Sequence, residues 1–153
     1  MVGLIASGGE AVPTQVEISY RPYGLEEYVV IEAVPDQAMT AYAPIPAPRI
    51  GHYLPAAAVI QKAAALADHR RMQPRDVFDL DLLFRKFSNV AVPGLVEPAV
   101  LDAAVERTLL LEFDRYRAKV VSFLEPAVMV AFDNAAGWEN TQLRVVERLE
   151  AMR

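Results

Sequence analysis

Apolar and polar residues alternate along the first third of the chain and recur with helical spacing after Leu54. In residues 15–22 (QVEISYRP) every second residue from Val16 to Tyr20 is apolar, which is the period of a half-buried strand. Further strands are predicted for residues 27–34, 38–42 and 49–53. The pattern therefore favours a small antiparallel sheet of three or four strands before Leu54.

Beyond Leu54 the apolar spacing is helical, and prolines stand where helices would begin. Helices are predicted for residues 55–72, 74–88, 98–123, 127–132 and 138–152. The last of these would bury a stripe of Leu143, Val146 and Leu149. The fold class expected is α+β, with a small antiparallel sheet packed on a C-terminal helical bundle. We expect a β-rich unit over residues 1–54 and a helical one over 55–153.

Composition narrows the possible functions. The 153 residues are 54% hydrophobic and 23% charged, enough apolar material for a packed core. A net charge of −5 argues against a broad nucleic-acid surface but leaves room for a local basic patch. The absence of cysteine excludes disulfides and thiolate metal sites and suits a reducing cytoplasm. The sequence holds no run of apolar residues long enough to span a membrane, and its first residues do not resemble a signal peptide.

The candidate chemistry lies in the first two predicted helices. On the first, Lys62 shares a face with apolar residues, and His69 and Arg70 would extend that face. On the second, Asp76 lies within the apolar face and Asp79 on its edge. That apolar face consists of Val77, Leu80, Leu83, Phe84 and Phe87. Phe78 and Leu82 are apolar on the opposite side, so we expect this helix to be covered on both faces.

Two interpretations of these residues remain open on spacing alone. In the first, Lys62 pairs with Asp76 or Asp79 and locks the two helices together, while Arg75 and Asp79 form an ordinary surface pair. In the second, Lys62 and Arg70 bind a phosphate, and Asp76 and Asp79 orient those cations or meet a ribose. The two histidines, His52 and His69, lack matching acids for a metal site.

A longer stretch of the sequence resembles the AbiEii/AbiGii-type nucleotidyltransferase toxin family. The resemblance rests on VEISYR (residues 16–21), KAAAL (62–66), Arg70 or Arg71, and RDVFDL (75–80), with support from VSFLEP and AGWE near the end. It implies a partial nucleotidyltransferase fold that transfers a nucleotidyl group from a nucleoside triphosphate, with magnesium, to RNA such as tRNA. It also implies a cognate antitoxin as partner.

By matching position, the resemblance assigns roles to individual residues. Glu17 would be the strand carboxylate that binds metal, Lys62 the lysine that contacts the triphosphate, and Asp76 or Asp79 the helix carboxylate. Arg70 and Arg75 would help to bind the nucleotide.

One family feature is missing before Glu17. Members carry a Gly-Ser or Gly-Gly turn followed by an Asp-x-Asp pair on a strand, and no aspartate precedes Glu17 here. The expectation is a chain that lacks the leading segment and is inactive alone, or a non-catalytic interaction module. A sheet edge left open in this way would favour self-association, or a partner that supplies the missing strands.

Overall fold

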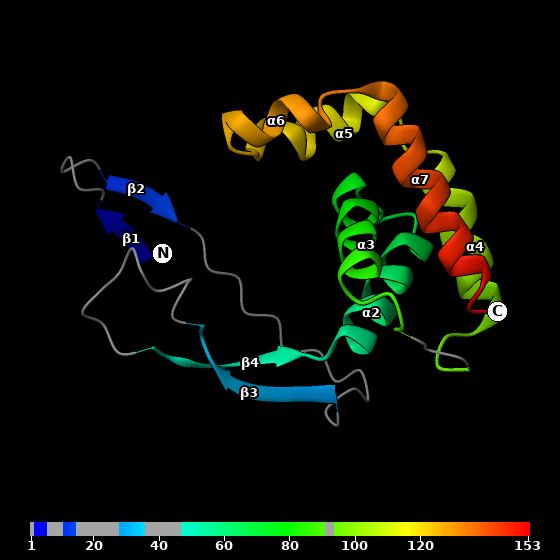
Figure 1. Cartoon of the computed structure of the whole chain (residues 1–153), viewed down its shortest axis with the longest axis horizontal. Coiled ribbons are helices and arrows are strands. Elements are labelled where there is room, and N and C mark those ends of the chain that lie inside the picture. Colours follow the sequence, from blue (N-terminus) through cyan, green and yellow to red (C-terminus); the bar gives the residue numbers. More distant parts are fainter. Residues whose placement is uncertain (1, 6–10, 15–27, 36–46, 91–93) are drawn as a thin grey trace.

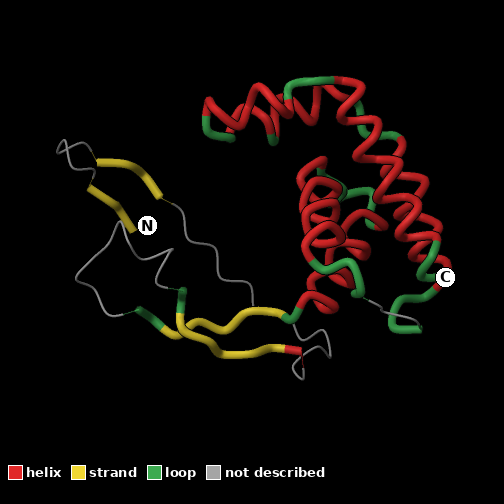
Figure 2. Tube along the Cα trace, in the orientation of Figure 1, coloured by secondary structure: helices red, strands yellow, loops and turns green. Residues whose placement is uncertain are grey.

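The computed structural model describes residues 2–5, 11–14, 28–35, 47–90 and 94–153. Two strand pairs lie on one side of a group of helices (Figures 1 and 2). The class is therefore α+β, as predicted. The predicted strands at residues 15–22 and 38–42 lie outside the described residues.

The described strands form two separate antiparallel pairs. Strand β1 (Val2–Ile5) pairs with β2 (Ala11–Thr14), and β3 (Val29–Ala33) pairs with β4 (Arg49–Tyr53). The second pair confirms two predicted strands, whereas the first was not predicted because VGLI and AVPT show no alternation. The single sheet of three or four strands that we expected is not formed by the described residues. Side chains of β3 and β4 stay largely exposed, with Ile31 62% accessible.

Three helices begin at the prolines that were predicted to start them, and α6 begins at Pro126, one residue before its predicted start. Pro55, Pro74, Pro98 and Pro126 each stand at the first position of a helix, where a missing N–H costs nothing. The helices are α2 (Pro55–Ala67), α3 (Pro74–Lys86), α4 (Pro98–Leu109), α5 (Phe113–Lys119), α6 (Pro126–Phe132) and α7 (Ala135–Glu150), with a 3-10 turn, η3, at Val121–Phe123.

The long helix predicted over residues 98–123 is wrong, because the chain breaks between α4 and α5. Leu111 is buried there, and its carbonyl accepts hydrogen bonds from Trp138 Nε1 at 2.8 Å and Gln142 Nε2 at 3.0 Å. Gln142 Nε2 also donates to the carbonyl of Thr108. Side chains of α7 therefore satisfy the carbonyls at the end of α4, and the helix does not need to continue.

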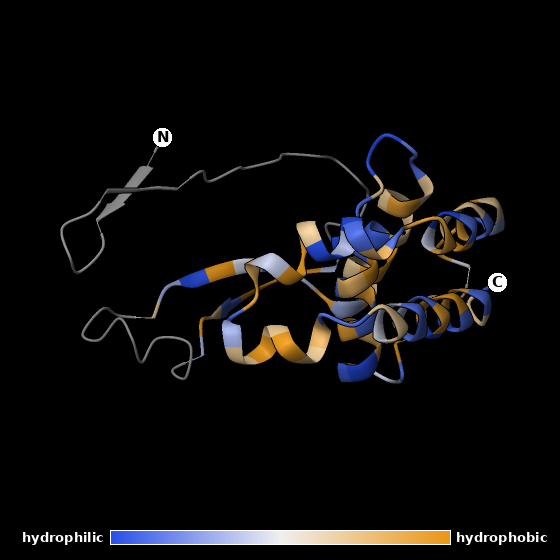
Figure 3. Ribbon diagram, turned by 90° about the horizontal axis from the view of Figure 1, so that it is seen from above, coloured by the Kyte–Doolittle hydropathy of each residue, from blue (hydrophilic) through white to orange (hydrophobic). Residues whose placement is uncertain are grey.

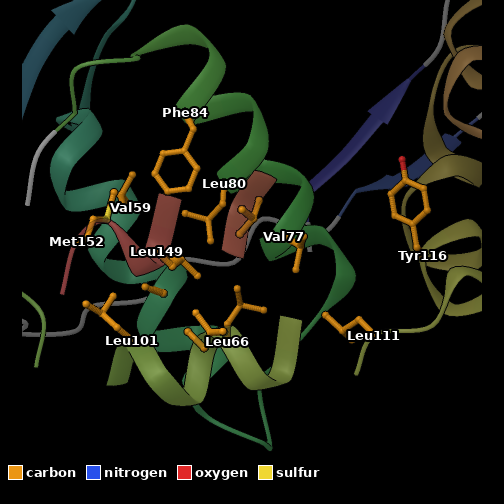
Figure 4. Close-up of a cluster of buried hydrophobic side chains, with 14 of the residues drawn as sticks. Val59, Leu66, Val77, Leu80, Phe84, Leu101, Leu111, Tyr116, Leu149 and Met152 are labelled. Atoms are coloured by element: carbon orange, nitrogen blue, oxygen red, sulfur yellow. The ribbon is translucent and has the colours of Figure 1, made fainter. Parts of the chain in front are cut away.

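The core lies among four helices. Helix α2 packs against α3 and α4, and α7 packs against α3 and α4. Figure 4 shows the side chains that fill the space between them, among them Val59, Leu66, Val77, Leu80, Leu101 and Leu149. Each of these helices carries both hydrophobic and hydrophilic residues (Figure 3), as expected for amphipathic helices around one core.

The buried face of α7 differs from the predicted stripe. Leu149 is buried as expected, but Leu143 is 58% exposed. The buried positions are Trp138, Thr141, Gln142, Val145 and Leu149. The polar Thr141 and Gln142 occupy the inner face because hydrogen bonds satisfy them there, and an apolar pattern could not reveal this.

Candidate functional site

The site is built on the contact between α2 and α3. Lys62 lies in the middle of α2, and Asp76 and Asp79 lie in the first two turns of α3, which packs against it. Asp76 is in the first helical turn, where the helix dipole favours a negative charge. Buried neighbours such as Val59 and Val77 hold the two backbones together and so fix the distance between the charged groups.

Lys62 bridges the two carboxylates. Its Nζ lies 2.8 Å from Asp76 Oδ1 and 2.7 Å from Asp79 Oδ2. The exposed fractions of the three side chains are 30% for Lys62, 13% for Asp76 and 27% for Asp79, so the cluster is largely withdrawn from water. The lock that spacing alone suggested is therefore present, and it engages both acids rather than one. We call these three residues the lysine clamp.

The clamp keeps the lysine charged. Partial burial of Lys62 acts to lower the pKa of its ammonium group, but hydrogen bonds and charge attraction from Asp76 and Asp79 outweigh it. The net result is a raised pKa for Lys62. The Lys62 side chain is therefore an ammonium group at neutral pH.

Arg75 makes only a long contact with the clamp. Its Nε lies 3.8 Å from Asp79 Oδ2, and its side chain is 75% exposed. The predicted i, i+4 pair thus exists in a weak form, worth well under about 1 kcal/mol. The guanidinium group remains available to solvent and to a ligand.

Arg70 does not extend the face of Lys62, contrary to the prediction. Helix α2 ends at Ala67, and Asp68 leaves the helical conformation with φ −90° and ψ 109°. His69, Arg70 and Arg71 are exposed on the turn that follows. The helix stops because Asp68 organises this turn, its carboxylate accepting a hydrogen bond from the backbone N–H of Arg70 at 2.9 Å.

A second charged cluster on α3 was not predicted. The Asp81 side chain is only 3% exposed and pairs with Arg144 of α7, with Nε–Oδ1 at 2.8 Å, and with Arg85 at 3.0 Å. The hydrogen bond to Asp81 raises the pKa of Arg144, although burial acts in the opposite direction. One clue was available in the sequence. Asp81 falls between Val77 and Phe84 on the buried stripe of α3, but its partner lies 63 residues away.

Aromatic rings cover another side of α3. Phe78 packs edge-on against Phe132 with ring centroids 5.4 Å apart, and it also contacts Tyr116. Tyr116 stacks on Trp138 at 4.1 Å with an interplanar angle of 11°. Burial, together with the charges of Asp81 and Asp133, raises the pKa of Tyr116 to about 12. The prediction that α3 is covered on both faces is confirmed at Phe78, while Leu82 is 42% exposed.

The described residues alone do not fit a metal ion. Within the described ranges no three side chains of His, Cys, Asp or Glu come together as a metal-binding group. Asp76 and Asp79 are close, but the Lys62 ammonium already lies between them. Glu17, the predicted metal ligand, lies outside the described residues. None of the described helices is long and apolar enough to cross a membrane.

The clamp can act in two ways. As a closed ion-pair network it joins α2 to α3. As an anion site it would exchange a carboxylate oxygen for a phosphate oxygen at Lys62 Nζ, because both are acceptors of charge-assisted hydrogen bonds. The exposed Arg75 lies beside such an anion.

Comparison with protein families places this chain alongside nucleotidyl transferases. The model of the family described as "Nucleotidyl transferase AbiEii toxin, Type IV TA system" matches residues 2–150. Comparisons with curated proteins and with solved structures give no match.

Proposed function

Because the chain belongs to the AbiEii family of nucleotidyl transferase toxins, we propose that it takes part in transferring a nucleoside monophosphate from a nucleoside triphosphate to an RNA such as tRNA. The observation that carries this proposal is the lysine clamp. It is a charged lysine, held between two carboxylates and bordered by an arginine, on the segment on which the resemblance to the family mainly rests. We assign Lys62 and Arg75 to the triphosphate and Asp76 and Asp79 to the positioning of Lys62.

In the clamp, Lys62 would be a cation that is already positioned for a phosphate but is paired with Asp76 and Asp79 until the nucleotide binds. An incoming triphosphate carries more negative charge than a single carboxylate and would displace Asp76 or Asp79 from Lys62. The displaced carboxylate would then be free to meet a ribose hydroxyl or an incoming hydroxyl. Burial of the clamp strengthens each of these interactions relative to bulk water.

Magnesium, when bound, would neutralise charge on the phosphates during transfer. The described residues do not supply a complete set of ligands for it. We propose that Glu17, together with acids from a segment or chain that adds the Asp-x-Asp strands, completes this set. Catalysis by this chain would then require that addition. The proposed location is the cytoplasm, where triphosphates and tRNA occur.

Isothermal titration with magnesium and each of the four nucleoside triphosphates tests the proposal. We expect binding of at least one nucleotide, with affinity reduced tenfold or more in Lys62→Met. Arg117→Met is the matched control, because Arg117 and Asp133 form an ion pair at 2.8 Å far from the clamp in sequence. If the wild-type chain binds none of the four, the proposed nucleotide site does not exist.

A second function is supported by the closed state of the clamp. Because Lys62 pairs with both carboxylates, the network would in this alternative serve only to hold α2 against α3. In that case the chain would be a non-catalytic interaction module. The type IV toxin–antitoxin family implies an antitoxin partner. This alternative predicts a stable complex with that partner and no transfer of label from any α-labelled triphosphate to tRNA. A partner that adds strands, or a second copy, would appear as an increased mass in light scattering.

A further inference from the structure

Four arginines gather around the connection between α2 and α3, and we call them the arginine surface: Arg70, Arg71, Arg75 and Arg115. From Ala67 to Arg75 the sequence has three arginines and one aspartate, Asp68, although the whole chain has a net charge of −5. All four side chains are exposed. The connection is thus a local positive region on an acidic protein.

The arginine surface differs in its pairing from four other arginines, although Arg107 and Arg148 also form no ion pair with a carboxylate among the described residues. Arg85, Arg117, Arg144 and Arg153 each form an ion pair of 3.0 Å or less with an aspartate. Within the described part of the chain, no carboxylate pairs with Arg70, Arg71 or Arg115, and Arg75 makes only its 3.8 Å contact. The guanidinium donors of the arginine surface are therefore not neutralised by carboxylates in the described structure.

The backbone beneath these side chains is held in place. Asp68 accepts hydrogen bonds at its carbonyl from the N–H groups of Arg71 and Met72, at 2.9 and 3.0 Å, and at its carboxylate from Arg70. Arg115 of α5 reaches the carbonyl of Met72 with Nη2 at 3.4 Å. The arginines thus come from both sides of a fixed turn, which reduces the entropy lost when they bind a ligand.

From these observations we propose that the arginine surface binds the phosphate backbone of RNA. This inference rests on the proposed function, because the arginine surface would hold the acceptor RNA next to the nucleotide bound at the clamp. Guanidinium groups bind phosphate through two parallel hydrogen bonds. The turn begins at Asp68, six residues beyond Lys62, which is roughly 9 Å along the helix axis. A free triphosphate at Lys62 does not need several cations at that distance, whereas a polynucleotide presents a phosphate at every step.

The test measures RNA binding by the full chain without nucleotide. A fluorescein-labelled single-stranded RNA of about 20 nucleotides is long enough for a surface of this kind, and fluorescence anisotropy gives its affinity. Arg70→Gln/Arg71→Gln should reduce affinity about tenfold at low salt. The slope of log affinity against log salt should fall by about 1.4, since each lost phosphate contact contributes roughly 0.7.

The matched control is Lys119→Gln/Arg153→Gln, which removes the same charge from exposed positions outside the arginine surface. It should change affinity less than about twofold. Equal loss in both double variants would mean that only net charge matters and would overturn the proposal. Equally tight, Arg70- and Arg71-dependent binding of anionic lipid vesicles would overturn the assignment to RNA.

Measuring nucleotide binding and RNA binding on the same full-length chain distinguishes the proposal for the clamp from the proposal for the arginine surface. Nucleotide binding without RNA binding would overturn the arginine surface and leave the clamp's function standing. RNA binding through Arg70 and Arg71 without nucleotide binding would do the reverse. Circular dichroism melts of both double variants establish that each is folded.

Discussion

The lysine clamp makes a prediction about stability that does not depend on nucleotide. Lys62→Met keeps the aliphatic length of the side chain but removes the ammonium group, and it leaves Asp76 and Asp79 facing each other without their cation. Removing one partner of a buried ion pair costs about 3–5 kcal/mol, and an exposed pair is worth about 0.2–1 kcal/mol. With the three side chains 13–30% exposed, the clamp lies between these limits, so we expect a loss of about 2 kcal/mol.

Urea and thermal unfolding followed by circular dichroism measure this loss. For a chain of 153 residues, about 2 kcal/mol corresponds to a fall in Tm of about 4–8 °C. Arg117→Met is the control and should cost less than about 1 kcal/mol, because the side chain of Arg117 is 61% exposed.

The triple variant Lys62→Met/Asp76→Asn/Asp79→Asn identifies the cause. If unpaired carboxylates destabilise Lys62→Met, neutralising them should restore more than half of the lost stability. Equal destabilisation of the single and triple variants would instead assign the loss to packing of the lysine stem. A single variant as stable as the wild type would refute the clamp as a link between α2 and α3.

Three further predictions concern groups outside the clamp. Arg144→Met should destabilise the fold by about 2–4 kcal/mol in urea unfolding, because Asp81 is almost completely buried and would keep only Arg85 as a partner; a loss below about 1 kcal/mol would contradict this. Tyr116 should ionise near pH 12 in an ultraviolet titration, and Tyr116→Phe should remove that step. Since the folded state keeps this proton while the unfolded state loses it near pH 10, the contribution of Tyr116 to stability should decline between pH 10 and about 12. Gln142→Leu should cost about 1–3 kcal/mol, because the carbonyl of Thr108 loses its side-chain donor and the carbonyl of Leu111 keeps only Trp138 Nε1; unchanged stability would show that the lost hydrogen bonds are replaced.

Local rules predicted the starts of the helices that begin with a proline, but not the start of α5 at Phe113, the start of α7 at Ala135 or the end of α4. Pro55, Pro74, Pro98 and Pro126 act through their own geometry, so the sequence reveals each start. The break at Leu111 depends on donors from α7, which lie 27 and 31 residues further along the chain. No local pattern contains that information.

In the candidate site, too, contacts between nearby segments were predicted and contacts with distant segments were not. Lys62, Asp76 and Asp79 were predicted because neighbouring helices bring nearby segments together, and the structure joins all three. The prediction for Arg70 requires a helix that continues past Ala67, whereas Asp68 favours a turn there. Asp81 was missed because an acid on an apolar stripe makes sense only once its distant partner, Arg144, is known.

The break after α4 also divides the molecule into parts of unequal local stability. Helix α6 has seven residues and none is buried, and Phe123 and Val130 before and within it are about 80% exposed. Helices α2 and α7 each bury five residues. Amide hydrogens of α6 should therefore exchange with solvent through local opening, while those of α2 and α7 exchange only when the whole core opens. Among the described helices, a protease that probes the native state should cleave near α6 before it cleaves within the four-helix core.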